Sequence, residues 1–82
     1  MSAPSEERPN YELNKFVYDF VRNSSFRERY FEEREKVLRG SKLTEEERRA
    51  FLSKDMHKLR ELGVYPFLAY IYSTRYRNTK MD

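Results

Sequence analysis

The stretch LTEEERRAFLSKDMHKLRELGVYPFL, residues 43–68, holds the start and stop signals of three short helices. Thr44 is followed three residues later by a glutamate, which is the pattern of a capping box, and the acids between them suit the positive end of a helix dipole. Asp55 can cap a second helix, which Gly63 ends. Pro66 fits the first turn of a third helix, where its missing N–H costs nothing. The stretch therefore predicts helices joined by brief turns.

Upstream of this stretch, apolar residues recur at helical spacing. Asn10 is a suitable N-cap, and the spacing predicts a helix over residues 11–22 with one buried face. The residues of that face are Leu13, Phe16, Val17, Phe20 and Val21. Ser25, with Glu28 three residues later, predicts a capping box for a further helix. Gly40 suits a left-handed position at the end of the helical segment that follows.

The fold class that these signals predict is all-α, a small bundle of five or six short helices with irregular packing. Few β-branched residues occur and no run alternates apolar and polar residues. The expected organisation is a helical domain over residues 10–74. Residues 1–9 are polar, with two prolines, and are expected to form a disordered arm. Residues 75–82 are expected to form a basic polar tail.

Composition limits what the chain can be. Its 82 residues form one domain, and both the hydrophobic and the charged fractions are 38%. Seven Tyr and six Phe supply much of the apolar surface that can be buried. There is no cysteine, and no run approaches the roughly 20 apolar residues of a membrane span. The first residues contain no hydrophobic signal, so we expect a cytoplasmic protein.

The residues that most enzymes use are scarce. His57 is the one histidine in the sequence, whereas a catalytic non-haem iron site needs two histidines and a carboxylate. Zinc sites need a comparable cluster, and no glycine-rich phosphate loop occurs. We expect no catalytic residues, no metal site and no cofactor in this chain. The sequence therefore argues against an enzyme that works alone.

Two features favour binding. The tail interleaves Arg75, Arg77 and Lys80 with Tyr76, as nucleic-acid binders do, but the net charge of only +3 argues against that partner. The other feature is the helix after Pro66, which is apolar on nearly every side and so must be surrounded. From the residues alone, this helix is equally compatible with the centre of the domain and with a contact surface.

Two segments together resemble a known family. LTEEERRAFLSKDMHKLRELGVYPFL and, upstream, LNKFVYDFVRNSSFRERYFEEREKVL are similar to the small (α) subunit of protocatechuate 4,5-dioxygenase, over about residues 11–72. The resemblance implies a non-catalytic, all-helical small subunit of a class III extradiol ring-opening dioxygenase. In such enzymes a large subunit holds Fe(II) with two histidines and a glutamate. The small subunit docks on it and helps to close the substrate pocket.

The resemblance also implies which residues contact the partner and its substrate pocket. Tyr65, Pro66 and Phe67 match the loop-to-helix junction nearest the large subunit. The full set of expected contacts is Val64, Tyr65, Pro66, Phe67, Leu68, Tyr70 and Ile71. The sequence departs from the family at Tyr65, where many members have another residue, and it lacks the long C-terminal extension of the type enzyme.

An alternative function stays open. The helical module resembles the leader-binding part of split borosin N-methyltransferase precursors, which carry a modified core at the C-terminus. Here the segment after the module, STRYRNTKMD, is short and has no Val/Ile-rich core. A module that docks on another enzyme or peptide, outside ring cleavage, is the second hypothesis.

Overall fold

The computed structural model describes residues 10–81, and within this range the chain forms six helices and no strand. The helices are α2 (Tyr11–Arg22), α3 (Ser24–Glu32), α4 (Arg34–Gly40), α5 (Glu45–Ser53), α6 (Met56–Glu61) and α7 (Pro66–Arg75). The predicted all-α class is confirmed. No helix in the described range is long and apolar enough to cross a membrane. The arm predicted for residues 1–9 lies outside the described residues.

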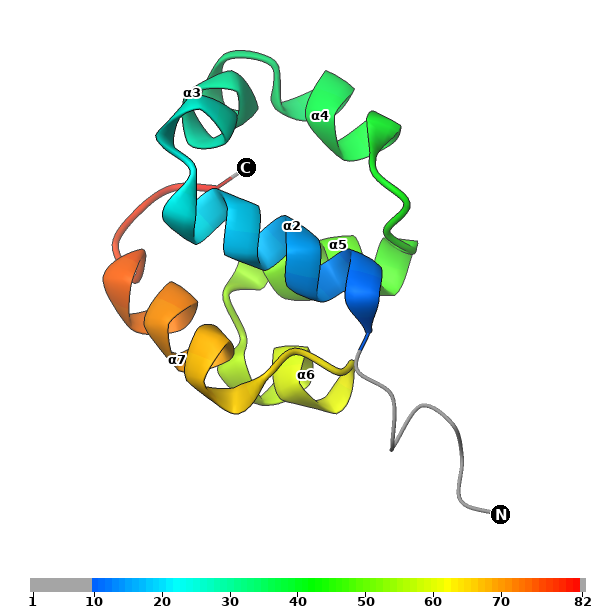
Figure 1. Cartoon of the computed structure of the whole chain (residues 1–82), viewed down its shortest axis with the longest axis vertical. Helices are drawn as coiled ribbons and strands as arrows, with labels where there is room; N and C mark the ends of the chain where they lie inside the picture. Colours follow the sequence, from blue (N-terminus) through cyan, green and yellow to red (C-terminus); the bar gives the residue numbers. More distant parts are fainter. Residues whose placement is uncertain (1–9, 82) are drawn as a thin grey trace.

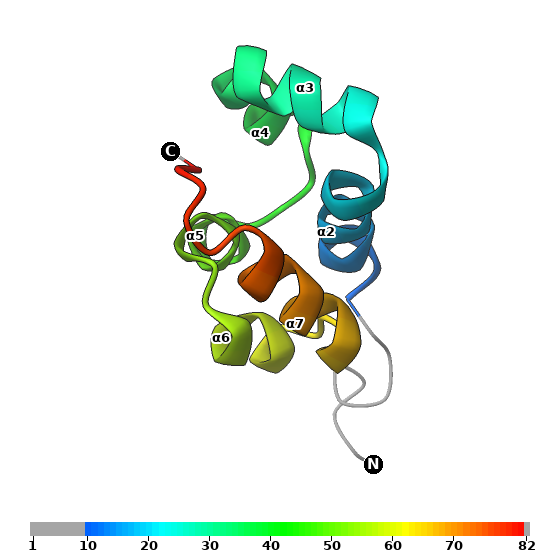
Figure 2. The same cartoon turned by 90° about the vertical axis from the view of Figure 1, so that its left-hand side faces the viewer.

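The helices lie in three tiers. Helices α2 and α5 are in the middle, with α3 and α4 on one side and α6 and α7 on the other (Figures 1 and 2). Helix α2 packs against both α3 and α7, and α6 packs against α7. Because α2 contacts both outer tiers, the core packs against its apolar face.

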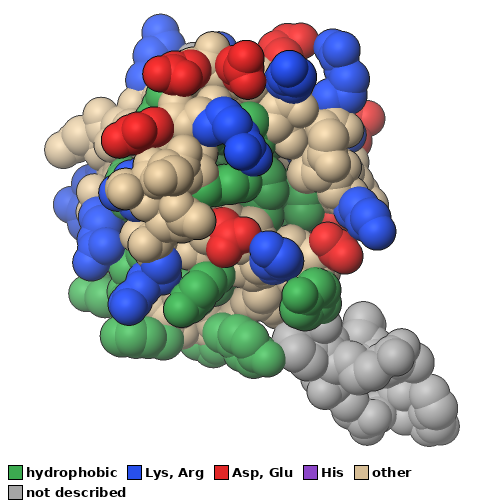
Figure 3. Space-filling model, turned by 45° about the horizontal axis from the view of Figure 1, so that its top comes forward, with side chains coloured by type: hydrophobic (Ala, Val, Ile, Leu, Met, Phe, Trp, Pro, Cys, Tyr) green, Lys and Arg blue, Asp and Glu red, His purple; other side chains and the backbone are tan. Residues whose placement is uncertain are grey.

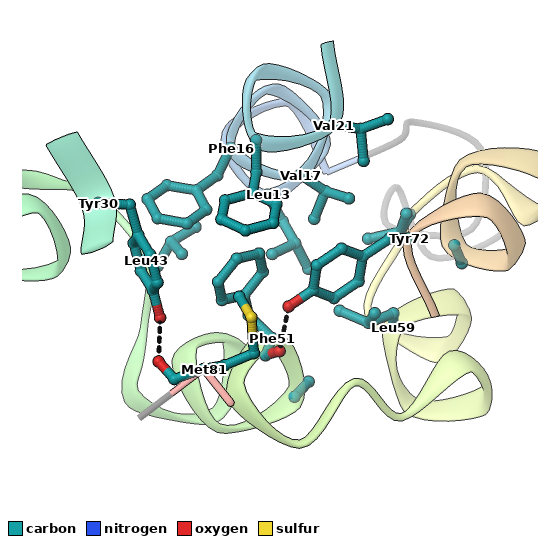
Figure 4. Close-up of a cluster of buried hydrophobic side chains, with 14 residues drawn as sticks. Leu13, Phe16, Val17, Val21, Tyr30, Leu43, Phe51, Leu59, Tyr72 and Met81 are labelled. Atoms are coloured by element: carbon teal, nitrogen blue, oxygen red, sulfur yellow. Dashed lines mark hydrogen bonds between the residues drawn. The ribbon is translucent and has the colours of Figure 1, made fainter. Parts of the chain in front are cut away.

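The core is a cluster of aromatic rings. Phe20, Tyr30, Phe51 and Tyr72 are fully buried, and the ring of Phe51 stacks on that of Tyr72 with centroids 4.8 Å apart. The Tyr30 hydroxyl donates to the Met81 carbonyl oxygen and the Tyr72 hydroxyl to that of Phe51, both at 2.7 Å (Figure 4). Burial raises the pKa of Tyr72 far above its ordinary value, so its phenol stays protonated. Both of these buried hydroxyls therefore have a hydrogen-bond acceptor.

Most of the predicted helix starts are confirmed. The side chains of Asn10, Thr44 and Asp55 each accept a hydrogen bond from the backbone N–H three residues later. The capping box of Thr44 is complete, since the Glu47 carboxylate accepts from the Thr44 N–H at 2.8 Å. Pro66 opens α7 as expected.

Two local predictions are wrong. Ser25 does not cap α3, because Asn23 lies two residues earlier and its side chain accepts from the Phe26 N–H at 3.1 Å. Asparagine is an equally good N-cap, and this one also ends α2. Gly40 does not adopt a left-handed conformation but is the last residue of α4. Ser41 ends that helix instead, since its N–H and its hydroxyl both donate to the Leu38 carbonyl oxygen.

The segment that the sequence described as a basic polar tail packs on the domain. Helix α7 continues through Arg75, and Met81 is only 1% exposed. The Lys54 ammonium donates to the carbonyl oxygens of Arg77 and Thr79. Residues 76–81 therefore form a strap across the core, which polar composition does not predict.

Candidate partner-binding surface

Exposed aromatic side chains gather at the start of α7. Tyr65, Phe67 and Tyr70 are 55%, 74% and 53% exposed, while Ala69 and Tyr72, on the opposite side of the same helix, are fully buried. Hydrophobic side chains are concentrated along the lower edge of the molecule in Figure 3, on the side of α7. We call Tyr65, Phe67 and Tyr70 the α7 aromatic surface. Helix α7 contains no acidic residue, so this surface carries no negative charge of its own.

The other predicted contact residues are placed differently. Pro66 is exposed and borders the α7 aromatic surface. Leu68 and Ile71 are partly buried and pack against the core, so each offers only part of its side chain to a partner. Val64 is 2% exposed and belongs to the core. Its inward position follows from the turn, because its N–H donates to the Leu59 carbonyl oxygen at 2.9 Å and closes the end of α6.

The turn that carries Tyr65 is held by a buried asparagine. Asn14 is 7% exposed and is the one polar residue of the described chain in the buried class. Its amide nitrogen donates to the carbonyl oxygens of Asn10 and Gly63, at 3.0 and 2.8 Å. Its amide oxygen accepts from the Tyr65 N–H at 3.0 Å. Asn14 therefore fixes the backbone on both sides of Val64.

Asn10 adds a second set of contacts to the same turn. Its amide nitrogen donates to the Leu62 carbonyl oxygen at 3.0 Å and to the Glu47 carboxylate. Glu47 thus serves the capping box of α5 and the start of α2 at once. We call Asn10 and Asn14 the asparagine clamp. It joins the first residues of α2 to the turn between α6 and α7.

Gly63 allows the clamp to close. Its φ of +109° lies in the region that favours glycine. A Cβ added there would lie 2.8 Å from the Asn10 Cβ and 2.9 Å from the Asn10 backbone nitrogen. Glycine is therefore required both by the backbone conformation and by the close approach of Asn10.

The sequence did not single out Asn14. The available signal was its position, because residue 14 lies one turn before Val17 and Tyr18 and borders the apolar stripe of α2. A polar residue at the edge of such a stripe is buried only where it finds partners. Those partners come from residues 63 and 65, about fifty positions later, so the sequence alone cannot reveal them.

The described residues do not form a metal site. No three His, Cys, Asp or Glu side chains within residues 10–81 come together in a way that could hold an ion. His57 is exposed on α6. An iron centre that needs two histidines and a carboxylate does not fit the residues of this part of the chain.

The fold and this surface define a small helical domain with exposed aromatic side chains next to a hydrogen-bonded turn. The family model for the aromatic-ring-opening dioxygenase LigAB, LigA subunit, matches residues 13–77. The chain belongs to this family, the small subunits of ring-opening dioxygenases. A search of curated proteins and one of solved structures each gave no match. The resemblance read from residues 11–72 is therefore confirmed, and the match spans all six helices except the first two residues of α2.

Proposed function

We propose that this chain docks on the iron-bearing large subunit of an aromatic-ring-opening dioxygenase through the α7 aromatic surface and helps to close its substrate pocket. The observation that carries the proposal is the exposure of three aromatic side chains near the start of α7, Tyr65 at its N-cap and Phe67 and Tyr70 within it. Family membership supplies the class of partner.

Aromatic side chains in this arrangement suit a protein interface. A few Tyr, Trp and Arg residues usually carry most of the binding free energy of an interface, and they lie near its centre. Phe67 is 74% exposed, and Tyr65 and Tyr70 can bury their rings while each hydroxyl still finds a hydrogen-bond partner. The absence of acids on α7 avoids the cost of burying an unpaired carboxylate.

The asparagine clamp supports the same function by fixing the turn before binding. The Tyr65 N–H and the Gly63 carbonyl oxygen are both bonded to Asn14, so the junction is ordered without the partner. A contact surface that is already in its bound conformation loses less entropy on association. Tyr65 and Phe67 therefore present their rings from a backbone that need not rearrange.

The Fe(II) would belong to the large subunit. Two histidines and a carboxylate are the expected ligands, and the described residues offer no such group. When bound there, the iron would bind the aromatic substrate and activate oxygen for ring opening. This chain would contribute apolar contacts beside the pocket, which exclude water and limit the space open to the substrate.

The test is association with the large subunit of a ring-opening dioxygenase of this family, measured by calorimetry. We expect Tyr65→Ala and Phe67→Ala each to raise the Kd at least tenfold, about 1.4 kcal/mol, because each removes an exposed aromatic contact. The free energy of unfolding of the isolated chain should change by less than about 0.5 kcal/mol. Tyr11→Ala is the matched control, since Tyr11 is 68% exposed but lies on α2 and should leave the Kd unchanged.

Several outcomes would reject the proposal. If Tyr65→Ala and Phe67→Ala instead unfold the isolated chain, by the roughly 3–5 kcal/mol of an emptied aromatic core site, the surface is structural. A complex that forms but opens no aromatic ring would favour a docking module on another enzyme, such as an N-methyltransferase. The pocket role is tested separately: Phe67→Ala, at concentrations that saturate the complex, should raise the KM for the aromatic substrate.

A further inference from the structure

The exposed face of α7 does not end at the α7 aromatic surface. Phe67, Tyr70 and Thr74 are exposed and lie three or four residues apart, so they share one side of the helix. Arg75 follows Thr74 and is also exposed. At about 1.5 Å per residue, Arg75 lies roughly 12 Å from Phe67 along the helix axis. The exposed part of α7 therefore runs from an apolar end to a cationic end.

The positive charge of this region has no counterion in its own segment. Residues 62–81 contain Arg75, Arg77 and Lys80, which are all exposed, and no Asp or Glu. In the described part of the chain, none of these three side chains takes part in an ion pair. Residues 10–61, in contrast, interleave acidic with basic side chains. The end of α7 and the strap after it thus form a surface of one sign.

A hollow between the end of α5 and α7 joins this cationic end to the α7 aromatic surface. It has a volume of about 350 Å³, and Tyr70 and Arg77 both line it. Lys54 lines it as well, together with three hydroxyl side chains, but no acidic side chain of the described residues does. The carboxylate of the next residue, Asp55, instead accepts from the Lys58 N–H at the start of α6. The lining of the hollow therefore carries net positive charge.

Lys54 is held in position beside the strap. It ends α5 in a left-handed conformation, with a φ of 57°. Its ammonium group donates to the carbonyl oxygens of Arg77 and Thr79, which are neutral and leave its positive charge uncompensated. A carboxylate in the hollow would meet cationic donors, and hydrogen bonds between charged groups are stronger than those between neutral ones.

We propose that the α7 aromatic surface and this hollow form one continuous docking surface, and that the partner places an acidic segment over Lys54 and Arg77. The inference rests on the proposed function, which identifies the partner as the large subunit, and it adds the chemistry that this partner presents. The large subunit should carry an apolar recess for Phe67 and, roughly 10–15 Å away, at least one Asp or Glu side chain. Arginine suits this contact because its planar guanidinium binds a carboxylate through two parallel hydrogen bonds.

The first test measures the association rate constant of the full chain with the large subunit by stopped-flow fluorescence. At about 50 mM salt, the double variant Arg75→Gln/Arg77→Gln should associate about fivefold more slowly, because charge complementarity mainly accelerates encounter. At about 0.5 M salt the difference should fall below about twofold, since ions screen exposed charges. Lys36→Gln/Lys42→Gln is the matched control, because it removes the same charge from two exposed lysines on the α4 side and should leave the rate unchanged.

The second test locates the acidic group of the partner. A carbodiimide joins a lysine amine directly to a carboxylate that contacts it, and Arg77→Lys keeps the positive charge while it supplies such an amine. We expect mass spectrometry of the coupled complex to find position 77 joined to an Asp or Glu of the large subunit. Lys36 should form no such link, and links to Lys36 with none at position 77 would overturn the inference.

The outcomes of the rate measurement separate this inference from the docking function. If Phe67→Ala weakens the complex but the arginine variant associates as fast as the unchanged chain, the docking function stands and the acidic segment is rejected. Equal slowing by both double variants would show that only net charge matters, which also overturns the inference. If the unchanged chain does not associate with the large subunit, the docking function fails and this inference fails with it.

Discussion

The turn between α6 and α7, residues 62–65, and the segment around α4, residues 33–43, are built in opposite ways. The first is fixed by the asparagine clamp, through hydrogen bonds to its carbonyl and N–H groups. The second begins at Glu33, which makes no side-chain capping bond, and α4 has no buried residue and packs mainly against α3. One segment holds the exposed Tyr65 in place, and the other borders an open groove between α2 and α4.

The two glycines of these segments have unlike roles. Gly63 has a φ of +109° and a close neighbour, while Gly40 has a helical backbone and open space. The sequence assigned both to helix ends for the same reason. Only the surroundings separate a glycine that the fold requires from one that it tolerates.

The largest effect is expected for Gly63→Ala. The new Cβ would be strained at a positive φ and would press on the Asn10 backbone nitrogen, which cannot move without breaking the cap of α2. We expect a loss of roughly 3 kcal/mol in the free energy of unfolding. Urea denaturation measures it. A loss below about 1 kcal/mol would mean that the turn and α2 do not press on each other as described.

A smaller loss, about 2 kcal/mol, is expected for Asn14→Ala, which leaves the Gly63 carbonyl oxygen and the Tyr65 N–H without this partner. Hydrogen exchange at the Tyr65 amide should accelerate more than at the core amides of α5, because the bond that protects it is gone. Tyr18→Ala, one turn later and 53% exposed, is the control and should leave that amide unchanged. Equal exchange rates in both variants would show that the clamp does not order the turn.

The smallest effect has the opposite sign. Gly40→Ala should raise the free energy of unfolding by about 0.5–1 kcal/mol, because alanine loses less backbone entropy in a helix and meets no atom here. The same urea titration measures it, with Gly63→Ala as the matched counterpart. Destabilisation by Gly40→Ala would show that this segment is more constrained than its contacts indicate.

Much of the fold could be predicted because its signals are local. Asn10, Thr44 and Asp55 cap helices through atoms three residues away, and the apolar stripe of α2 repeats at helical spacing. Where two local signals compete, the sequence does not show which one the helix uses. Asn23 and Ser25 are both good caps, and their order along the chain decided which one α3 uses.

What sequence analysis missed depends on contacts between distant residues. Asn14 is buried because residues 63 and 65 come to it, and Val64 is in the core because its N–H closes α6. Met81 lies within a segment of polar composition, yet its side chain is buried in the core and its carbonyl oxygen accepts from the Tyr30 hydroxyl. The candidate surface was predicted as a set of seven residues between positions 64 and 71. The structure divides the set into exposed, half-buried and buried members because a helix turns each residue by about 100°.

The strap of residues 76–81 also determines when the core can be completed during translation. Helices α2 and α3 are translated before this segment, and the carbonyl oxygen that accepts from the Tyr30 hydroxyl belongs to Met81, more than fifty positions after Tyr30. Until that segment has been translated, the cluster around Phe20 and Tyr30 lacks the side chains of Tyr76 and Met81 that pack against it. A nascent chain therefore cannot complete this part of the core until residues 76–81 have been made, and α2 and α3 stay incompletely covered until then.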